Sequence, residues 1–504
     1  MNYTELLTFV APEALIVLAA FGVLAVDLIT LRDSSRPARL AAAAGLTVLG
    51  CVAAMLALFI APPVTPEDYL GGILIVGRLT LMVKFILLAL TLFTALISLE
   101  SDFTEHIGEY YALVLLATAG MMFLVSTEHL LMIFVSLELL SLCLYVMTAF
   151  NKRQVQSAEA ALKYFLFGGM SAAVLLFGFS LLYGATGEVQ LSRMAARAMG
   201  VSEDPIFLTG LLMVVAGLGF KIAAVPFHLW APDAYEGAPL PSAAFIASGS
   251  KVASFYLLVR MMISGVGGNV GGAPVGAPLQ GWVLMLVVVA ALSVVVGNLA
   301  AIVQTSVRRL LAYSAVAHAG YILAGLLAGD RVHAVASVLY YVTTYALTTL
   351  GAFAVVAVVQ ERCGDDRLAS FAGLSRREPI VAGCMLVFLL SLAGIPPLAG
   401  FFGKFYLFRS ALLGPGPAQP LSLLWLVILA LAMSAVSLYY YLQVLKQIFV
   451  SEGSGTGAPA AWVAGRGGTA PMMKVVLLAL AGAVVLLGCF PDLLIDKLLA
   501  ALGS

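Results

Sequence analysis

Long apolar runs, each about as long as a bilayer is thick, follow one another along nearly the whole chain. A transmembrane helix needs about 20 predominantly apolar residues, and the sequence contains fourteen such runs. The prediction is an all-α polytopic membrane protein in which residues 1–504 form a single transmembrane domain. The runs cover approximately residues 12–31, 38–60, 79–99, 110–126, 129–149, 160–184, 206–230, 241–264, 281–303, 310–328, 332–360, 380–410, 422–448 and 472–496.

Lysine and arginine are distributed unevenly between the loops that join these runs. The odd-numbered loops carry fourteen of them, whereas the even-numbered loops and nearby helix ends carry six. Because an excess of Lys and Arg marks cytoplasmic loops, the odd-numbered loops are predicted to be cytoplasmic. Both termini are then expected on the non-cytoplasmic side of the membrane.

The composition agrees with this class and excludes several others. Hydrophobic residues make up 62% of the chain and charged residues 10%, whereas a soluble domain carries about 25% charged residues. The 26 basic residues equal the 26 acidic ones, so no net charge points to nucleic acid. The five cysteines are scattered, and no nucleotide or haem motif is recognisable, so we expect no cofactor or metal in this chain itself.

Five lysines nevertheless lie inside apolar runs. A charge placed at the centre of a membrane helix costs about 2.5–3.5 kcal/mol on insertion scales. Ionisable residues that are kept there commonly mark ion or proton pathways. The five are Lys84, Lys163, Lys221, Lys251 and Lys404.

Two of these lysines stand beside prolines that should break their helices. Lys221 precedes Pro226 in the seventh run, and Lys404 follows Pro396-Pro397 in the twelfth. Broken helices at membrane depth are tolerated where they line a polar cavity, and they mark ion sites in transporters. His228 lies just beyond the first break and joins the candidates. The two broken runs are five spans apart, an odd number, so the units that contain them should be inverted repeats.

Two further charges lie deep in their runs. Lys251 is about ten residues from either end of the eighth run, with Ser248 and Ser254 on one face. Glu138 lies in the fifth run and has Ser141 one turn away on the same face. We predict a buried carboxylate that pairs with a lysine and takes part in transport. A purely structural ion pair between helices is the alternative.

The remaining ionisable residues are less distinctive. Lys163 lies early in the sixth run, where a proton-transfer role and snorkelling to the membrane surface fit equally well. His318, in the tenth run, fits a proton relay, with a hydrogen-bonded helix contact as the alternative. Lys84, near the start of the third run, and Asp27, near the end of the first, are explained adequately by snorkelling.

Five segments together resemble the antiporter-like membrane subunits of respiratory complex I and of Mrp-type cation/proton antiporters, and among them the N-type subunits of bacterial NADH–quinone oxidoreductase. The resemblance implies fourteen helices, of which helices 4–8 (residues 110–264) and 9–13 (281–448) are inverted repeats. Helices 1–3 (residues 1–109) precede the repeats, and helix 14 (472–504) follows them. The segments are SLELLSLCLYVMTAF, EAALKYFLFGGMSAAVLLFGFSLLYGATG, GFKIAAVPFHLWAPDAYEGAP, RRLLAYSAVAHAGYILAGL and SLAGIPPLAGFFGKFYLF.

The resemblance also implies roles for individual residues. Glu138 would be the glutamate of the fifth helix, Lys221 its partner on the seventh, Lys251 the central lysine of the eighth and Lys404 the terminal lysine. The M-type subunits carry a glutamate where Lys404 stands. The L-type subunits continue in a long amphipathic helix beyond the core, whereas this sequence stops at Ser504.

The function implied is proton translocation driven by electron transfer from NADH to quinone. NADH, FMN, iron–sulfur clusters and quinone would be bound by partner subunits, and this chain would carry no redox site. Its partners would be the other membrane-arm subunits and the lipid of a bacterial cell membrane. Two alternatives are a subunit of a Mrp-type cation/proton antiporter and a structural subunit that pumps nothing.

Overall fold

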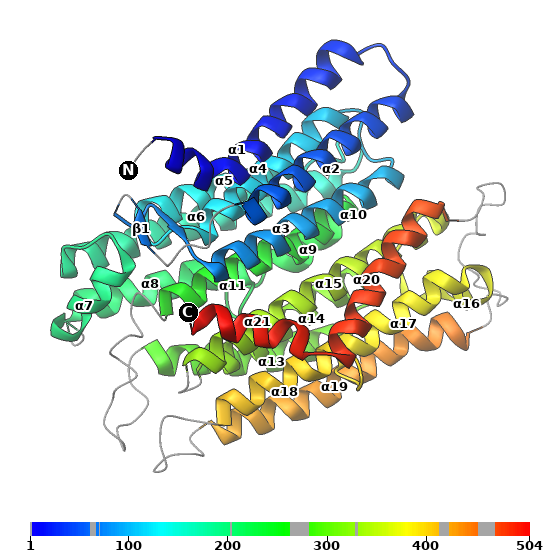
Figure 1. Cartoon of the computed structure of the whole chain (residues 1–504). Coiled ribbons are helices and arrows are strands. Elements are labelled where there is room, and N and C mark those ends of the chain that lie inside the picture. Colours follow the sequence, from blue (N-terminus) through cyan, green and yellow to red (C-terminus); the bar gives the residue numbers. More distant parts are fainter. Residues whose placement is uncertain are drawn as a thin grey trace. The chain divides into compact units, whose positions relative to one another are not determined.

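The computed structural model describes residues 3–60, 67–69, 71–201, 204–262, 282–327, 331–412, 423–451 and 469–503. Long helices make up almost all of this part of the chain (Figure 1). Twelve helices within it are long and apolar enough to cross a membrane. The predicted class, an all-α polytopic membrane protein, is confirmed.

The predicted total of fourteen spans remains a prediction. The twelve long apolar helices correspond to predicted runs one to nine, eleven, thirteen and fourteen. The tenth run falls on α14 (Val307–Leu326), which begins with two arginines and carries several polar residues. The twelfth falls on two shorter helices, α17 (Pro379–Ala393) and α18 (Ala399–Leu412).

The described residues fall into two compact units in which distant parts of the chain combine. The first unit comprises Met1–Leu218 and Gly237–Val270, and the second comprises Gly219–Glu236 and Gly271–Gly503. The helices of the first unit are α1 (Tyr3–Ala25), α2 (Arg36–Ile60), α3 (Arg78–Ile97), α4 (Ile107–Val125), α5 (Leu130–Thr148), α6 (Val155–Thr186), α7 (Leu191–Val201), most of α8 (Pro205–Ile222), α10 (Leu240–Ala247) and α11 (Gly249–Arg260).

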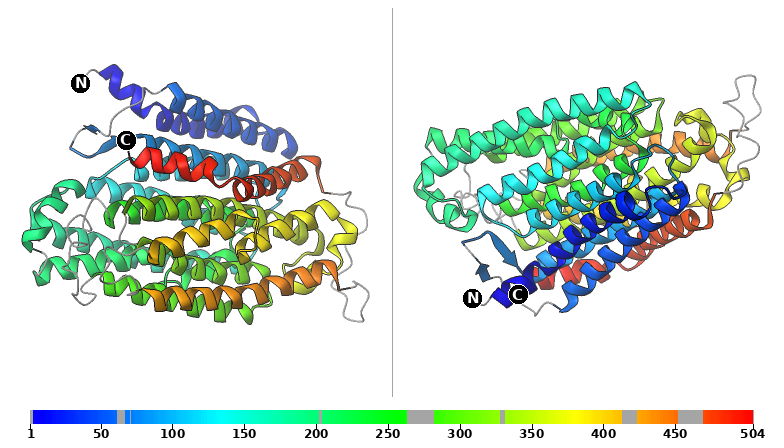
Figure 2. Two further views of the ribbon diagram at one scale, coloured as in Figure 1. Left: turned by 60° about the horizontal axis from the view of Figure 1, so that its bottom comes forward. Right: turned by 90° about the horizontal axis from the view of Figure 1, so that it is seen from above.

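The second unit begins inside α8, so that the end of this helix and the segment after it belong to the second unit. Within this unit α13 packs against α14 and α19, and α15 packs against α14, α17, α18 and α20. Figure 2 shows these helices running side by side. Besides α14, α17 and α18, its helices are α9 (Trp230–Gly237), α13 (Trp282–Ile302), α15 (Arg331–Cys363), α16 (Leu374–Arg377), α19 (Leu424–Phe449), α20 (Pro471–Cys489) and α21 (Asp492–Leu502).

A short antiparallel hairpin, which the apolar pattern does not predict, lies between the second and third spans. Its strands β1 (Glu67–Tyr69) and β2 (Leu74–Val76) pair with Glu67 opposite Val76. Leu74 and Val76 pack against Phe9 of α1. The Ile75 N–H donates to the carbonyl of Ser126, in the turn between α4 and α5. The strands are too short to show a clear alternation of apolar and polar residues.

Two predicted helix breaks are present, and a third one was missed. The helix that ends at Ile222 resumes at Trp230, and the one that ends at Ala393 resumes at Ala399. The eighth run, predicted as continuous, is interrupted at Ser248 (φ −114°, ψ −80°), between α10 and α11. No proline signals this break, and the Ser248 hydroxyl instead donates back to the Ala244 carbonyl at 2.7 Å.

Candidate functional site

The first break follows directly after Lys221 and is held by hydrogen bonds from side chains. The indole N–H of Trp230 donates to the Phe220 carbonyl at 2.8 Å, and the N–H of Val225 donates to the Ser293 hydroxyl of α13 at 2.9 Å. Breaking a helix frees backbone polar groups that must find other partners in a membrane. These side chains supply such partners, so the break is a stable part of the structure.

Both predicted ionisable residues at this break are buried. Lys221 is 6% exposed, and its Nζ lies 5.4 Å from the ring centroid of Phe220. His228 lies within the break, two residues before α9 begins, and is 8% exposed. The second unit therefore encloses a lysine in the last turn before the break and a histidine within the break.

The second break is closed by Lys404. Its Nζ donates to the carbonyls of Leu392 and Ala393, at 2.9 and 3.0 Å, and to the Ser434 hydroxyl of α19 at 2.7 Å. The last carbonyls of a helix lack partners within that helix and carry a partial negative charge. Lys404 thus satisfies the carboxyl end of α17, and its charge lies 5.2 Å from the centre of the Tyr321 ring.

His318 lies between two tyrosines in the same unit. Its Nδ1 is 2.5 Å from the Tyr341 hydroxyl of α15, and its Nε2 is 3.2 Å from the Tyr441 hydroxyl of α19. The Tyr441 hydroxyl also hydrogen-bonds to the hydroxyl of Ser314. Both ring nitrogens of this buried imidazole therefore contact groups that can donate or accept a proton.

Lys404 and His318 belong to one cluster, which we call the tyrosine–lysine cluster. Tyr321 links the two sides, because its ring lies under the Lys404 ammonium and packs edge-on against the His318 imidazole. Its hydroxyl accepts from the Asn298 amide at 2.9 Å, and the Asn298 oxygen accepts from Tyr440 at 3.0 Å. The cluster comprises Asn298, Ser314, His318, Tyr321, Tyr341, Lys404, Ser434, Tyr440 and Tyr441.

Sequence analysis missed the α13 and α19 members of this cluster. They are Asn298, Ser434, Tyr440 and Tyr441. The available signals were an asparagine in an otherwise apolar run and three consecutive tyrosines at residues 439–441. Neither signal indicates which other helix the side chains face.

The candidate residues of the first unit lie on α11, α5 and α6. Lys251 is 2% exposed and lies just after the interruption at Ser248. Glu138 is half-buried on α5, and the Tyr145 hydroxyl of the same helix packs tightly against Gly168 of α6. Glu138 and Lys221 belong to different units, so their pairing remains a prediction.

Lys163 is the most exposed of the candidate lysines. Its side chain is 42% exposed and forms an ion pair at 2.8 Å with Glu159, one turn earlier on α6. An exposed pair at this spacing stabilises a helix by only about 0.3–0.5 kcal/mol. A part in proton transfer for Lys163 therefore remains a prediction.

Two snorkelling predictions are wrong. Lys84 and Glu13 are both fully buried and form an ion pair at 2.6 Å. Asp27 is 2% exposed, binds both Nε and Nη2 of Arg39 at 2.7 and 2.6 Å, and accepts the Gly108 N–H at 3.0 Å. Snorkelling was inferred from position along a run, whereas the partners come from other helices.

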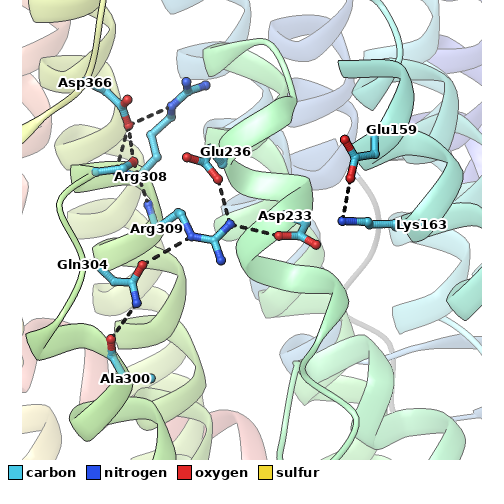
Figure 3. Close-up of polar contacts among 10 residues, drawn as sticks. Glu159, Lys163, Asp233, Glu236, Ala300, Gln304, Arg308, Arg309 and Asp366 are labelled. Carbon is cyan, nitrogen blue, oxygen red and sulfur yellow. Dashed lines mark hydrogen bonds and ion pairs between the residues drawn. The ribbon is translucent and has the colours of Figure 1, made fainter. Parts of the chain in front are cut away.

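An arginine pair at the start of α14 anchors two other segments of the second unit (Figure 3). Arg309 donates from Nη1 to Asp233 at 2.9 Å and to Glu236 at 2.7 Å, and both carboxylates lie on α9. Arg308 binds Asp366, in the segment after α15, at 3.1 Å. Burial alone would raise the pKa of Asp366, but the nearby Arg308 charge and the hydrogen bonds from Ser306 and Arg308 lower it overall. The Asp366 carboxyl group is thus charged near neutral pH.

Replacing Arg309 with glutamine should destabilise the protein. The change leaves two carboxylates facing each other without their shared cation, a loss of about 1–2 kcal/mol for partly exposed charged hydrogen bonds. Glu159→Gln, which removes the exposed pair drawn in the same figure, is the matched control. The midpoint of thermal unfolding in detergent should fall for Arg309→Gln and stay nearly unchanged for the control. Equal midpoints would show that the anchor does not hold α9.

Comparison with known proteins gives the class of this chain. Residues 127–434, more than half of the chain, match the family described as "NADH:quinone oxidoreductase/Mrp antiporter, TM". The chain belongs to this family of antiporter-like membrane subunits, which confirms the resemblance in its sequence.

Individual relatives narrow this class. NADH-quinone oxidoreductase subunit N 2 of Acidobacterium capsulatum is 49% identical over 503 residues, which cover 98% of both chains. A chain of respiratory complex I from Thermus thermophilus is 34% identical with a TM-score of 0.77, over 97% of this chain and 99% of that chain. A chain of the Mrp complex from Dietzia sp. DQ12-45-1b, 22% identical over 98% of this chain and 97% of its own, shares the fold with a TM-score of 0.78.

Proposed function

We propose that this chain is a proton-translocating membrane subunit of an NADH–quinone oxidoreductase. Similarity to named subunits of that enzyme supports the class. The observation that carries the transport role is the enclosure of Lys221 and Lys404 at two helix breaks, with His318 hydrogen-bonded between tyrosines. Apolar side chains would fill these positions at lower cost if the chain only held other subunits together.

The tyrosine–lysine cluster would handle protons at defined atoms. The Lys404 ammonium is stabilised by two carbonyls and one hydroxyl. If the Ser434 hydroxyl or the end of α17 moves away, burial disfavours the charge and Nζ can release its proton. A histidine can accept a proton on one ring nitrogen and donate one from the other. His318 would therefore pass protons between Tyr341 and Tyr441.

The other predicted residues would extend this path along the membrane. In the proposal Glu138 and Lys221 form a charge pair whose opening changes the charge on Lys251, and Lys251 in turn acts on Lys404. His228 would transfer protons at the first helix break, and Lys163 would do so at the exposed end of the proton path. Moving one proton against the membrane potential requires about 2.3 kcal/mol per 100 mV. Electron transfer from NADH to quinone in partner subunits would supply this energy.

The proposal includes partners and location. The chain would lie among other membrane-arm subunits in a bacterial cell membrane, with both termini on the non-cytoplasmic side. NADH, FMN, iron–sulfur clusters and quinone would be bound by those partners. Proteolysis of tags at the two termini in right-side-out vesicles would test the orientation.

Replacing Lys251 with methionine tests the transport role. The variant removes a buried charge while keeping a flexible apolar chain of similar length. Proton pumping into membrane vesicles should fall by about 100-fold, a typical loss for a positioned proton-transfer group. NADH oxidation by an artificial acceptor should remain normal, which reports that the complex is assembled. Wild-type pumping in this variant would contradict the proposal.

A second candidate function is a subunit of a cation/proton antiporter, because the matched family includes Mrp antiporters. Sodium-dependent proton exchange in vesicles that lack NADH would support it. A structural subunit that pumps nothing would instead show lost assembly in every lysine variant. Normal assembly with lost pumping supports the oxidoreductase subunit.

A further inference from the structure

The most deeply buried ion pair of the first unit takes no part in the proposed path. Glu13 of α1 and Lys84 of α3 have no exposed surface, and Nζ lies 2.6 Å from Oε1. Among the side chains that the structure describes, Glu13 Oε2 has no hydrogen-bond partner. A buried carboxylate oxygen in this state can accept a proton or a water. Both residues lie outside the family-matched segment 127–434.

Lys84 also belongs to a buried polar stripe along α3. Thr80, Thr91, Thr94 and Ser98 recur on this face at helical spacing, and each is at most 2% exposed. Thr91 hydrogen-bonds to Thr118 of α4 at 2.8 Å. Apolar side chains would suffice for packing against the neighbouring helices. This face instead carries hydroxyl groups on both sides of the ion pair.

The start of the stripe contacts α11, the helix that carries Lys251. Thr80 lies 3.3 Å from the Tyr256 hydroxyl of α11. At the other end of the stripe, Ser98 hydrogen-bonds to Tyr110, which also interacts with Ser242 of α10. Because α10 precedes α11, α3 and α11 run in opposite directions. One turn forward on α3, from Thr80 to Lys84, therefore corresponds to one turn back on α11, from Tyr256 towards Lys251. Lys84 and Lys251 thus lie at the same level on neighbouring helices.

We propose that the Glu13–Lys84 pair is a proton-binding site that controls the charge on Lys251. The inference rests on the proposed function, since it gives this pair a part in the same transport cycle. A hydronium ion transfers its proton to Glu13 Oε2, which forms an O–H bond, and leaves as water, so the net charge of the pair changes from zero to +1. The uncompensated Lys84 ammonium then repels a proton on Lys251 and favours its release. Loss of the proton from Glu13 restores the pair.

The alternative is an ion pair that only fastens α1 to α3. Asp27–Arg39, in the same unit, provides the comparison, because Asp27 is equally enclosed and its partner is an arginine that stays protonated. For a fastening role, removal of one partner is strongly destabilising, whereas removal of both charges together is nearly neutral. The two roles therefore differ in the double variants.

The experiment compares Glu13→Gln/Lys84→Met with Asp27→Asn/Arg39→Gln in membrane vesicles. Both double variants should assemble, as reported by NADH oxidation with an artificial acceptor. The first should pump about tenfold more slowly, the effect of one charge about 10 Å from Lys251 at an effective dielectric constant of about 20. The second should pump normally. Infrared difference spectra of the wild type should show a protonated carboxyl band during turnover that is absent from the Glu13→Gln/Lys84→Met variant.

Wild-type pumping in the Glu13→Gln/Lys84→Met variant, or an unchanged carboxyl band in that variant, would overturn this inference. If Lys251→Met loses pumping while this double variant keeps it, the Glu13–Lys84 proposal fails and the proposed function stands. If Lys251→Met also pumps normally, the proposed function itself fails.

Discussion

Replacing Lys404 with methionine is expected to abolish proton translocation while leaving the complex assembled. The ammonium has three acceptors, the carbonyls of Leu392 and Ala393 and the Ser434 hydroxyl. Loss of a positioned proton-transfer group typically slows a reaction by about 100-fold or more. We expect a reduction of this size in the rate of proton pumping by membrane vesicles.

The assembly expectation follows from two opposing contributions. Leaving two buried carbonyls without their donor costs about 1–3 kcal/mol each. Removing a charge from a membrane helix recovers about 2.5–3.5 kcal/mol. These contributions nearly offset each other, so the variant should accumulate to normal levels.

Lys446→Met is the matched control for Lys404→Met. Lys446 is an exposed lysine on α19, the helix that supplies Ser434. Its replacement should change neither pumping nor abundance. Pumping that survives in Lys404→Met would remove Lys404 from the proton path, whereas lost abundance would make it a structural cap of α17 alone.

Replacing Gly403 with alanine is expected to disturb the tyrosine–lysine cluster without replacing any titratable residue. A Cβ at this position would lie 2.3 Å from Cδ2 of Tyr341, whose hydroxyl binds His318. Overpacking of this kind typically costs about 1–3 kcal/mol. The displaced ring should also weaken the hydrogen bond to the imidazole, so both thermal stability and pumping should fall.

Gly383→Ala tests whether the effect belongs to this contact. Gly383 lies in α17 of the same broken span, and a Cβ there would have no atom within 4 Å. Since alanine favours helix by about 1 kcal/mol over glycine, this control should be neutral or slightly more stable. Equal behaviour of the two variants would mean that Tyr341 tolerates the added methyl group.

Much of the candidate site could be predicted from single residues. Lys221 and Lys404 stood out because a charge and a helix-breaking proline rarely occur together in an apolar run, and both breaks are present in the structure. Lys251 stood out by its depth in its run and is buried. These predictions rest on the free-energy cost of placing a charge or a broken helix in lipid. That cost can be judged from the segment that contains the residue.

Predictions about partners failed more often. Lys84 and Asp27 were assigned to the membrane surface, but each forms a buried ion pair with a residue of another element. The Ser248 interruption also went unnoticed, because a serine hydroxyl rather than a proline accompanies it. Nothing local to these residues indicates which helix packs against them.

By itself, the sequence determined the class of this protein, because the bilayer imposes a length and an apolar composition on each spanning helix. It also indicated which segments carry chemistry, since each buried charge must be retained against a desolvation cost. Only the tertiary structure decided that Lys404 closes the end of α17, that His318 lies between Tyr341 and Tyr441, and that Glu13 neutralises Lys84. Those pairings join residues from 11 to 123 positions apart, and only packing of the helices brings such residues within hydrogen-bond distance.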